Sequence, residues 1–499
     1  MLQSHNGLCS KIKKYAVSLA WAPLLMVGSA WAGSPAPAVR LLNSVPIPVS
    51  PFNPLAGTVQ AGTYSFDISF VDQSTGVYYL ADRNNFAIDV LSTESIITQI
   101  FPNNGFGPFA GFTPCAVQPA GANDCAGPNG VVAAFPWLFV TDAPSRVLTF
   151  DLRFNPPKTV SQVFTMPGEP TRADELAYDP KDRLILAINN ASSPPFGTLI
   201  SVDAAGNLAV VKNIIFDAMH GVDAQNGAEQ PVWDPGTQKF YLSIPQIGGN
   251  PTVGGVIRIS TAGTVEAIYT LTFCSPAGLA LGPNENLLAG CNTIWEDTDG
   301  ALWTGNADRR IHTAAPQLVI LDAVTGVTLA NVTGAGVGDE VWFNTGDNHY
   351  YAASSGSNLA PNALFPARPP VGTATTAPVN VSQGAATLDA IDALSQTLEQ
   401  RVPTFNVPAD PSGSHPAGTA HSVAAYSGTN HVFVPIAANN AVPDCLSGCI
   451  TIYGRDDPAS TENVTINNFA SNQGVQAVGV GASNNQDSNQ GAQVGVIIH

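Results

Sequence analysis

The sequence lacks the short motifs that mark the common catalytic classes. It contains no GxSxG nucleophile elbow, no P-loop, no GxGxxG following a strand, no HExxH and no CxxCH. These absences disfavour a typical serine hydrolase, a nucleotide-dependent enzyme, a zincin and a c-type cytochrome. Function must therefore be sought in residues that recur along the chain.

Charged residues are scarce, and positive ones scarcest. Only 11% of the chain is charged, with 19 Lys and Arg against 37 Asp and Glu, for a net charge of −18. Such an acidic chain repels nucleic acid and anionic lipid, so we expect neither as a partner. Cations are its natural small partners, although acidity that only maintains solubility explains the charge equally well.

Glycine and proline, by contrast, are abundant. The chain has 46 Gly and 40 Pro among 499 residues, and 44% of the chain is apolar. This composition is typical of an all-β protein with many strands and turns.

The first 32 residues predict an export signal. Lys11, Lys13 and Lys14 precede an apolar run at 15 to 28, and Ala30-Trp31-Ala32 has the small-x-small pattern of a cleavage site. The run is too short for a secure transmembrane helix, and no other segment is predicted to span a membrane. We expect cleavage after Ala32 and a periplasmic or secreted, monomeric protein.

Six cysteines remain after such cleavage, an even number that suits an oxidising compartment. Their positions predict three local disulfides, with zinc disfavoured because no ligand-spaced Cys/His cluster occurs. The expected pairs are Cys115 with Cys125, Cys274 with Cys291, and Cys445 with Cys449.

A β-hairpin recurs seven times. In AEQPVWDPGTQKFYLS (228 to 243), two strands flank a tight turn at Asp234 to Thr237. Equivalent hairpins lie at 67 to 82, 129 to 142, 174 to 189, 229 to 244, 277 to 292, 339 to 354 and 421 to 436. A third and a fourth strand follow each hairpin, and such units repeated radially predict a seven-bladed β-propeller over 33 to 469. Six blades is the alternative.

Two features of this propeller remain open in the sequence. Either ENVTINNF or the N-terminal VRLLNSVPIPV (39 to 49) could supply the fourth strand of blade 7. The Asn/Gln/Gly-rich segment 470 to 499 is predicted to be a flexible or loosely docked tail. Four insertions, at 101 to 128, 293 to 315, 355 to 385 and 402 to 420, are expected on the face where the first strands begin.

Aligning the hairpins places seven residues at one structural position, the start of each first strand. They are Asp67, Asn129, Asp174, Glu229, Ala277, Asp339 and His421. Because first strands line the centre of a propeller, these side chains are expected to converge at the mouth of its channel. Converging oxygen ligands suit Ca²⁺ or another hard divalent cation. Carboxylates so close also require a cation or protons to balance them, and a wet polar funnel without a fixed ion is the alternative.

Two stretches resemble a known family. EQPVWDP at 229 to 235 resembles the EGPVWDP stretch of the SMP-30/gluconolactonase family, and PNGV at 128 to 131 resembles its Asn-Gly motif. The resemblance implies a divalent metal held by Glu229, Asn129 and either Asp174 or Asp339, acting on a lactone. That family has six blades and places its Glu first in the chain. More generally, the repeats are similar to YVTN and NHL propellers, many of which bind partners without catalysis.

These observations predict one of two functions. The first is a metal-dependent hydrolase or lyase of a small lactone- or ester-like substrate, with His421 as the proton-transfer residue. The second is a non-catalytic propeller that binds a protein, glycan or small ligand through its long loops.

Overall fold

We analysed a computed structural model of the chain. It describes residues 38–53, 66–92, 96–112, 124–250, 252–272, 274–294, 317–333, 335, 340–354, 387–404, 422–436 and 448–455. The predicted signal peptide and tail, ENVTINNF, Asp339 and His421 lie outside these residues. All described strands belong to one compact unit that begins at Pro37.

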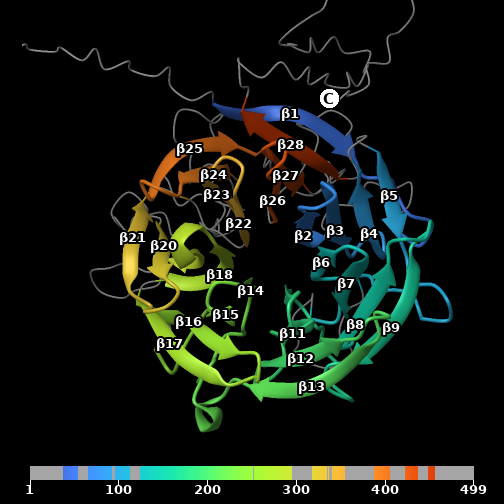
Figure 1. Ribbon diagram of the computed structural model, residues 1–499, viewed down its shortest axis with the longest axis horizontal. Helices are drawn as coiled ribbons and strands as arrows, with labels where there is room; N and C mark the ends of the chain where they lie inside the picture. The colour runs from blue at the N-terminus through green and yellow to red at the C-terminus, as the bar shows by residue number, and fades with distance from the viewer. Residues whose placement is uncertain are drawn as a thin grey trace, which may run out of the picture. The chain divides into compact units, whose positions relative to one another are not determined.

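That unit is a seven-bladed β-propeller, as the repeats predict (Figure 1). Its inner strands are β2 (Phe66–Asp72), β6 (Val131–Ala134), β10 (Leu176–Asp179), β14 (Pro231–Asp234), β18 (Cys274–Leu281), β22 (Glu340–Asn344) and β26 (Ala424–Tyr426). Each inner strand contacts the next, and β26 contacts β2, so the ring closes.

Three further strands complete each blade, and adjacent strands within a blade are antiparallel. The second strands are β3 (Val77–Asp82), β7 (Trp137–Asp142), β11 (Leu184–Asn189), β15 (Lys239–Ile244), β19 (Asn286–Ile294), β23 (His349–Ser354) and β27 (His431–Ile436). The third strands are β4 (Ala87–Leu91), β8 (Arg146–Asp151), β12 (Phe196–Val202), β16 (Val253–Ser260), β20 (Gln317–Asp322), β24 (Thr387–Asp392) and β28 (Cys449–Arg455). The outer strands are β5 (Ile97–Ile100), β9 (Lys158–Phe164), β13 (Leu208–Ile215), β17 (Val265–Thr272), β21 (Thr328–Thr333), β25 (Thr397–Pro403) and β1 (Val39–Pro46).

Blade 7 is completed by the N-terminal strand. β1 pairs antiparallel with β28, with Val39 opposite Arg455 and Pro46 opposite Cys449. Of the two strands that the sequence left open, the structure therefore uses VRLLNSVPIPV. One blade thus joins the two ends of the propeller sequence and closes the ring.

The core lies between the blades. Seven clusters of buried apolar residues occupy the seven seams between neighbouring sheets. Because each sheet is covered on both faces, second strands such as β7 and β15 are almost wholly buried. Burial on both faces explains why these strands read as continuous apolar runs.

The hairpin turns have a local cause. In blade 4, β14 pairs with β15 and the Asp234 carboxylate accepts a hydrogen bond of 2.7 Å from the Gly236 amide. Asp72 and Asp179 accept equivalent bonds from backbone amides two residues on, at 2.9 Å each. Such turns form from the sequence alone, because the aspartate satisfies the turn's own backbone.

The described residues contain two short 3₁₀ helices, η1 (Ala218–His220) and η2 (Pro283–Glu285). No helix among them is long and apolar enough to cross a membrane. Cys274 and Cys291 form the predicted disulfide across the β18–β19 hairpin. Cys125 and Cys449 are also disulfide-bonded, with partners outside the described residues. These bonds suit an oxidising compartment.

Candidate functional site

The fold brings the aligned positions together where the inner strands begin. Asp67 lies in β2 and Ala277 in β18, whereas Asn129, Asp174 and Glu229 each stand two residues before an inner strand. Backbone hydrogen bonds join neighbouring blades at this level. The Ile68 amide donates to the Asn129 carbonyl at 3.1 Å, and the Gln230 amide donates to the Ala277 carbonyl at 3.3 Å.

An arginine that the sequence analysis did not single out occupies the centre of this group. Arg83 follows β3 directly, and its guanidinium forms an ion pair with Asp67. Its Nε donates to Asn129 Oδ1 at 2.9 Å, and its Nη2 lies 4.0 Å from Asp174 Oδ1. One buried cation therefore bridges the aligned residues of blades 1, 2 and 3.

A second arginine supports the same group. Arg172 Nη2 donates to Asp174 Oδ2 at 2.8 Å, and Arg172 Nη1 lies 3.7 Å from Asp124 Oδ1. Burial opposes the charge of Arg172, but Asp174 and Asp67 outweigh it and raise the pKa of the guanidinium. Both arginines therefore remain charged and neutralise carboxylates at the inner-strand starts.

Two buried glutamates extend the group toward the next layer. Glu175 and Glu340 are 7% and 2% exposed. Glu340 accepts a hydrogen bond from Ser422 Oγ, which lies 2.6 Å from Ser69 Oγ. Burial, followed by the charges of Glu340 and Glu229, raises the pKa of Glu175 well above its usual range. Glu175 therefore binds a proton far more readily than an ordinary glutamate.

We call this group the inner-strand cluster. It comprises Asp67, Arg83, Asn129, Arg172, Asp174, Glu175, Glu229 and Glu340. Its carboxylates outnumber its guanidinium groups by five to two, so it remains acidic. Glu229 is its half-buried acid and lies 3.4 Å from Asn190 Nδ2.

The arrangement does not fit a divalent cation. Arg83 already takes the Asn129 Oδ1 atom, and Asn129 Nδ2 donates to the carbonyls of Ala126 and Ala173 at 3.0 and 2.9 Å. The amide cannot turn a second oxygen toward a metal, because it has only one. Asp67, the remaining acid beside it, is occupied by the Arg83 guanidinium. The charge balance that the sequence analysis assigned to a cation or protons is met here by two arginines and raised pKa values.

Sequence reasoning missed Arg83, Arg172 and Glu175. A signal for Arg83 did exist, because arginine is rare in this chain and Arg83 follows a second strand, where the chain returns to the level of the first-strand starts. Among the histidines considered, His220 is exposed and its Nδ1 lies 2.6 Å from Asp217 Oδ1. His312, His415 and His421 lie outside the described residues.

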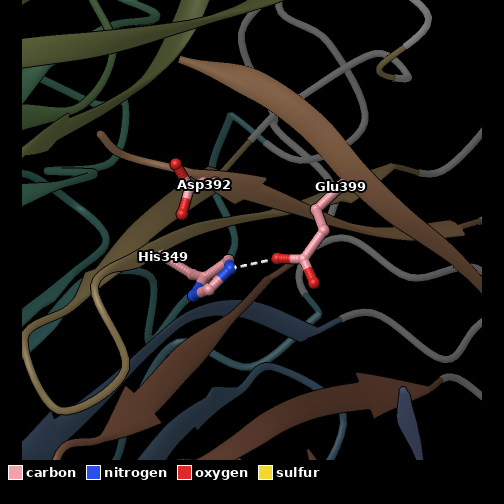
Figure 2. Close-up of side chains that lie close together, drawn as sticks. All are labelled: His349, Asp392 and Glu399. Carbon is pink, nitrogen blue, oxygen red and sulfur yellow. Dashed lines mark hydrogen bonds and ion pairs between the residues drawn. The ribbon is translucent and has the colours of Figure 1, made fainter. Parts of the chain in front are cut away.

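Within the described part of the chain, one group of three His, Asp or Glu side chains could share a metal ion. It consists of His349, Asp392 and Glu399 of blade 6, shown in Figure 2, and none of them belongs to the inner-strand cluster.

Comparisons with known proteins support the propeller fold and no closer relationship. No protein-family model matches the chain, and no curated protein matches its sequence. Among solved structures, hydrazine synthase of Kuenenia stuttgartiensis is similar with a TM-score of 0.51 and 10% identity, over 80% of this chain and 98% of that one. The Pan2 WD40 domain of Neurospora crassa gives a TM-score of 0.48 and 10% identity, covering 85% and 97%. A mitotic checkpoint complex chain gives 0.48 and 11%, covering 90% and 100%.

Proposed function

We propose that this chain is an exported, non-catalytic propeller that binds a small ligand, and that the inner-strand cluster holds a positively charged group of that ligand. The observation that carries the proposal is the Arg83 bridge between Asp67 and Asn129. It uses the oxygen atoms that a catalytic metal would need.

The charge of the cluster supports a cationic ligand. Its carboxylates exceed its arginines, and Glu175 holds a raised pKa because of its acidic neighbours. A ligand ammonium group close to Glu229 would reduce this repulsion. The partial exposure of Glu229 makes it the residue that such a group would contact.

The competing proposal is the metal-dependent lactone or ester hydrolase implied by the resemblance of EQPVWDP to the SMP-30/gluconolactonase family. In it, Glu229, Asn129 and Asp174 or Asp339 would bind Ca²⁺ or a similar ion, and His421 would transfer a proton. It requires Arg83 to leave Asn129 when the ion binds.

Isothermal titration of untagged protein with spermidine at low salt tests the proposal, with gluconate as the anionic comparison. We expect spermidine to bind and gluconate not to bind. Glu229→Gln should weaken spermidine binding at least tenfold, because it removes the partly exposed charge. Glu266→Gln on β17 is the matched control and should bind as the wild type does.

Elemental analysis of the same preparations distinguishes the two functions. The binding proposal expects no stoichiometric divalent metal that depends on Glu229. One equivalent of metal that is lost in Glu229→Gln, together with hydrolysis of a lactone, would establish the hydrolase instead.

A further inference from the structure

Three potential metal ligands lie on adjacent strands of blade 6. His349 begins β23, Asp392 ends β24 and Glu399 lies in β25. Their ligand atoms all fall within 4.8 Å of one another. Figure 2 shows the His349 ring turned toward the Glu399 carboxylate, with Asp392 beside them.

We propose that His349, Asp392 and Glu399 bind one divalent transition-metal ion, with Zn²⁺ as the reference ion. One imidazole nitrogen and two carboxylate oxygens form a donor set that zinc accepts. Glu399 is exposed, so water can complete the coordination. The site is independent of the inner-strand cluster and does not rest on the proposed function.

The orientation of the His349 ring is the first argument. His349 Nδ1 lies 2.7 Å from the Asp347 carbonyl oxygen, which can only accept a hydrogen bond, so Nδ1 carries a hydrogen. In the neutral ring, Nε2 then presents a lone pair to Glu399 Oε2, with which it is in close contact. Two lone pairs at this separation require a proton or a metal ion between them.

The groups around the three ligands fix their positions. The Asp347 carbonyl orients the imidazole, as outer partners of metal-bound histidines commonly do. Arg455 of blade 7 donates to both oxygens of Glu399, at 2.9 and 3.0 Å. Asp392 Oδ1 accepts bonds from the Leu394 and Ser395 amides at 3.1 and 2.6 Å. Each ligand is thus held on a rigid strand or turn before an ion binds.

The local charge suits a divalent ion. Asp347, Asp392 and Glu399 contribute three negative charges and Arg455 contributes one positive charge. With His349 neutral, the sum is that of two uncompensated carboxylates, which a divalent ion neutralises.

Comparison with other blades shows that this combination is particular to blade 6. Glu399 is the extra residue of a bulge in the outer strand, and His349 pairs with Asp392. In blade 4, Lys239 takes the place of His349, Ser260 that of Asp392, and Glu266 that of Glu399. In blade 7, His431 takes the place of His349, but Leu42 takes that of Glu399.

Blade 4 also supplies the simpler alternative. Lys239 Nζ binds Glu266 Oε1 at 2.7 Å without any metal. A protonated His349 could pair with Glu399 in the same way. The experiment must therefore separate a proton from an ion.

The test uses the untagged full chain, freed of metal with chelator and then dialysed against Zn²⁺. We expect the wild type to retain one Zn²⁺ more than His349→Gln and Glu399→Gln do, with at least tenfold weaker binding in both variants. His431→Gln is the matched histidine control and should retain the wild-type zinc content, as should Glu229→Gln.

Co²⁺ provides a second readout that does not depend on the folding of a variant. The wild type should develop visible absorption of a low-coordinate Co²⁺ complex, and Zn²⁺ should displace it. Equal zinc content in the wild type and in folded His349→Gln would overturn the proposal and leave a proton-mediated ion pair. Absence of the Co²⁺ spectrum from the wild type would overturn it as well.

Discussion

Val39 and Gln400 hold each other through two hydrogen bonds. The Val39 amide donates to Gln400 Oε1 at 2.7 Å, and Gln400 Nε2 donates to the Val39 carbonyl at 2.8 Å. Val39 begins β1, the outer strand of blade 7, and Gln400 lies on β25, the outer strand of blade 6. The pair fastens the strand that closes the ring to the neighbouring blade.

Gln400→Ala should therefore destabilise the protein by about 1–2 kcal/mol, because two partly buried backbone groups lose their partner. Urea unfolding at neutral pH measures the change. Gln162→Ala is the control, since that residue lies on the outer strand of blade 2 and its Oε1 contacts Arg146 Nη1 at a long 3.5 Å. A loss no larger than the control's would show that the clasp contributes nothing to ring closure.

Arg83→Met should destabilise the protein by about 3–5 kcal/mol, the usual effect of leaving buried charges without their partner. Asp67 and Asp174 would face each other without the guanidinium between them. Arg83→Lys should lose less, because it keeps the charge but not the forked geometry. Arg153→Met, whose side chain is 56% exposed, should cost less than about 1 kcal/mol and serves as the control. Equal effects of Arg83→Met and Arg153→Met would contradict the bridging role.

Asp82 and Asp89 in blade 1 form a buried carboxyl pair, and burial raises the pKa of both. The folded state holds their proton more tightly than the unfolded chain does. This contribution to stability is present at low pH and is lost as pH rises through the folded pKa. Asp89→Asn keeps the shape without the charge, and at pH 7 it should be more stable than the wild type by about 2 kcal/mol.

Urea unfolding at several pH values measures this gain, which should shrink toward pH 4. Asp203→Asn is the control and should show no gain, because the pKa of that exposed aspartate is lowered by its hydrogen bonds to Asn207. An Asp89→Asn protein that is less stable than the wild type at pH 7 would refute the assignment.

His431 should give the opposite response to acid. Burial lowers its pKa from 6.5 to about 4. Protonation therefore favours the unfolded chain, and stability falls as pH drops below 6.5 until about pH 4. Between pH 7 and 4 the wild type should lose about 2 kcal/mol more than His431→Gln, after allowance for the partial exposure of the ring. Parallel unfolding curves of the two proteins across this range would exclude the effect.

The propeller itself was predictable because its information is local. Asp234 satisfies its own turn, and β14 pairs with β15 four residues later, so the hairpin can be recognised within sixteen letters. The disulfide between Cys274 and Cys291 was predictable for the same reason, because both cysteines lie on one hairpin. Repetition then turned a local pattern into a blade count.

The chemistry of the inner-strand cluster was only half predictable. Alignment of the hairpins places Asp67, Asn129, Asp174 and Glu229 at equivalent positions, and the fold brings neighbouring blades together at that level. Alignment does not show that Arg83, from the end of a second strand, inserts among them. The cluster therefore looks like a metal site in the sequence, although its charges are balanced by arginine in the structure.

The sequence by itself thus determined the strands, their turns, the sevenfold repetition and the excess of acid, because each depends on residues close together in the chain. Tertiary structure alone decided which strand completes blade 7, because Val39 and Gln400 meet only after the ring has closed. It also decided that Glu399 faces His349, because a single bulge residue sets that register and β-strand side chains change face at every residue.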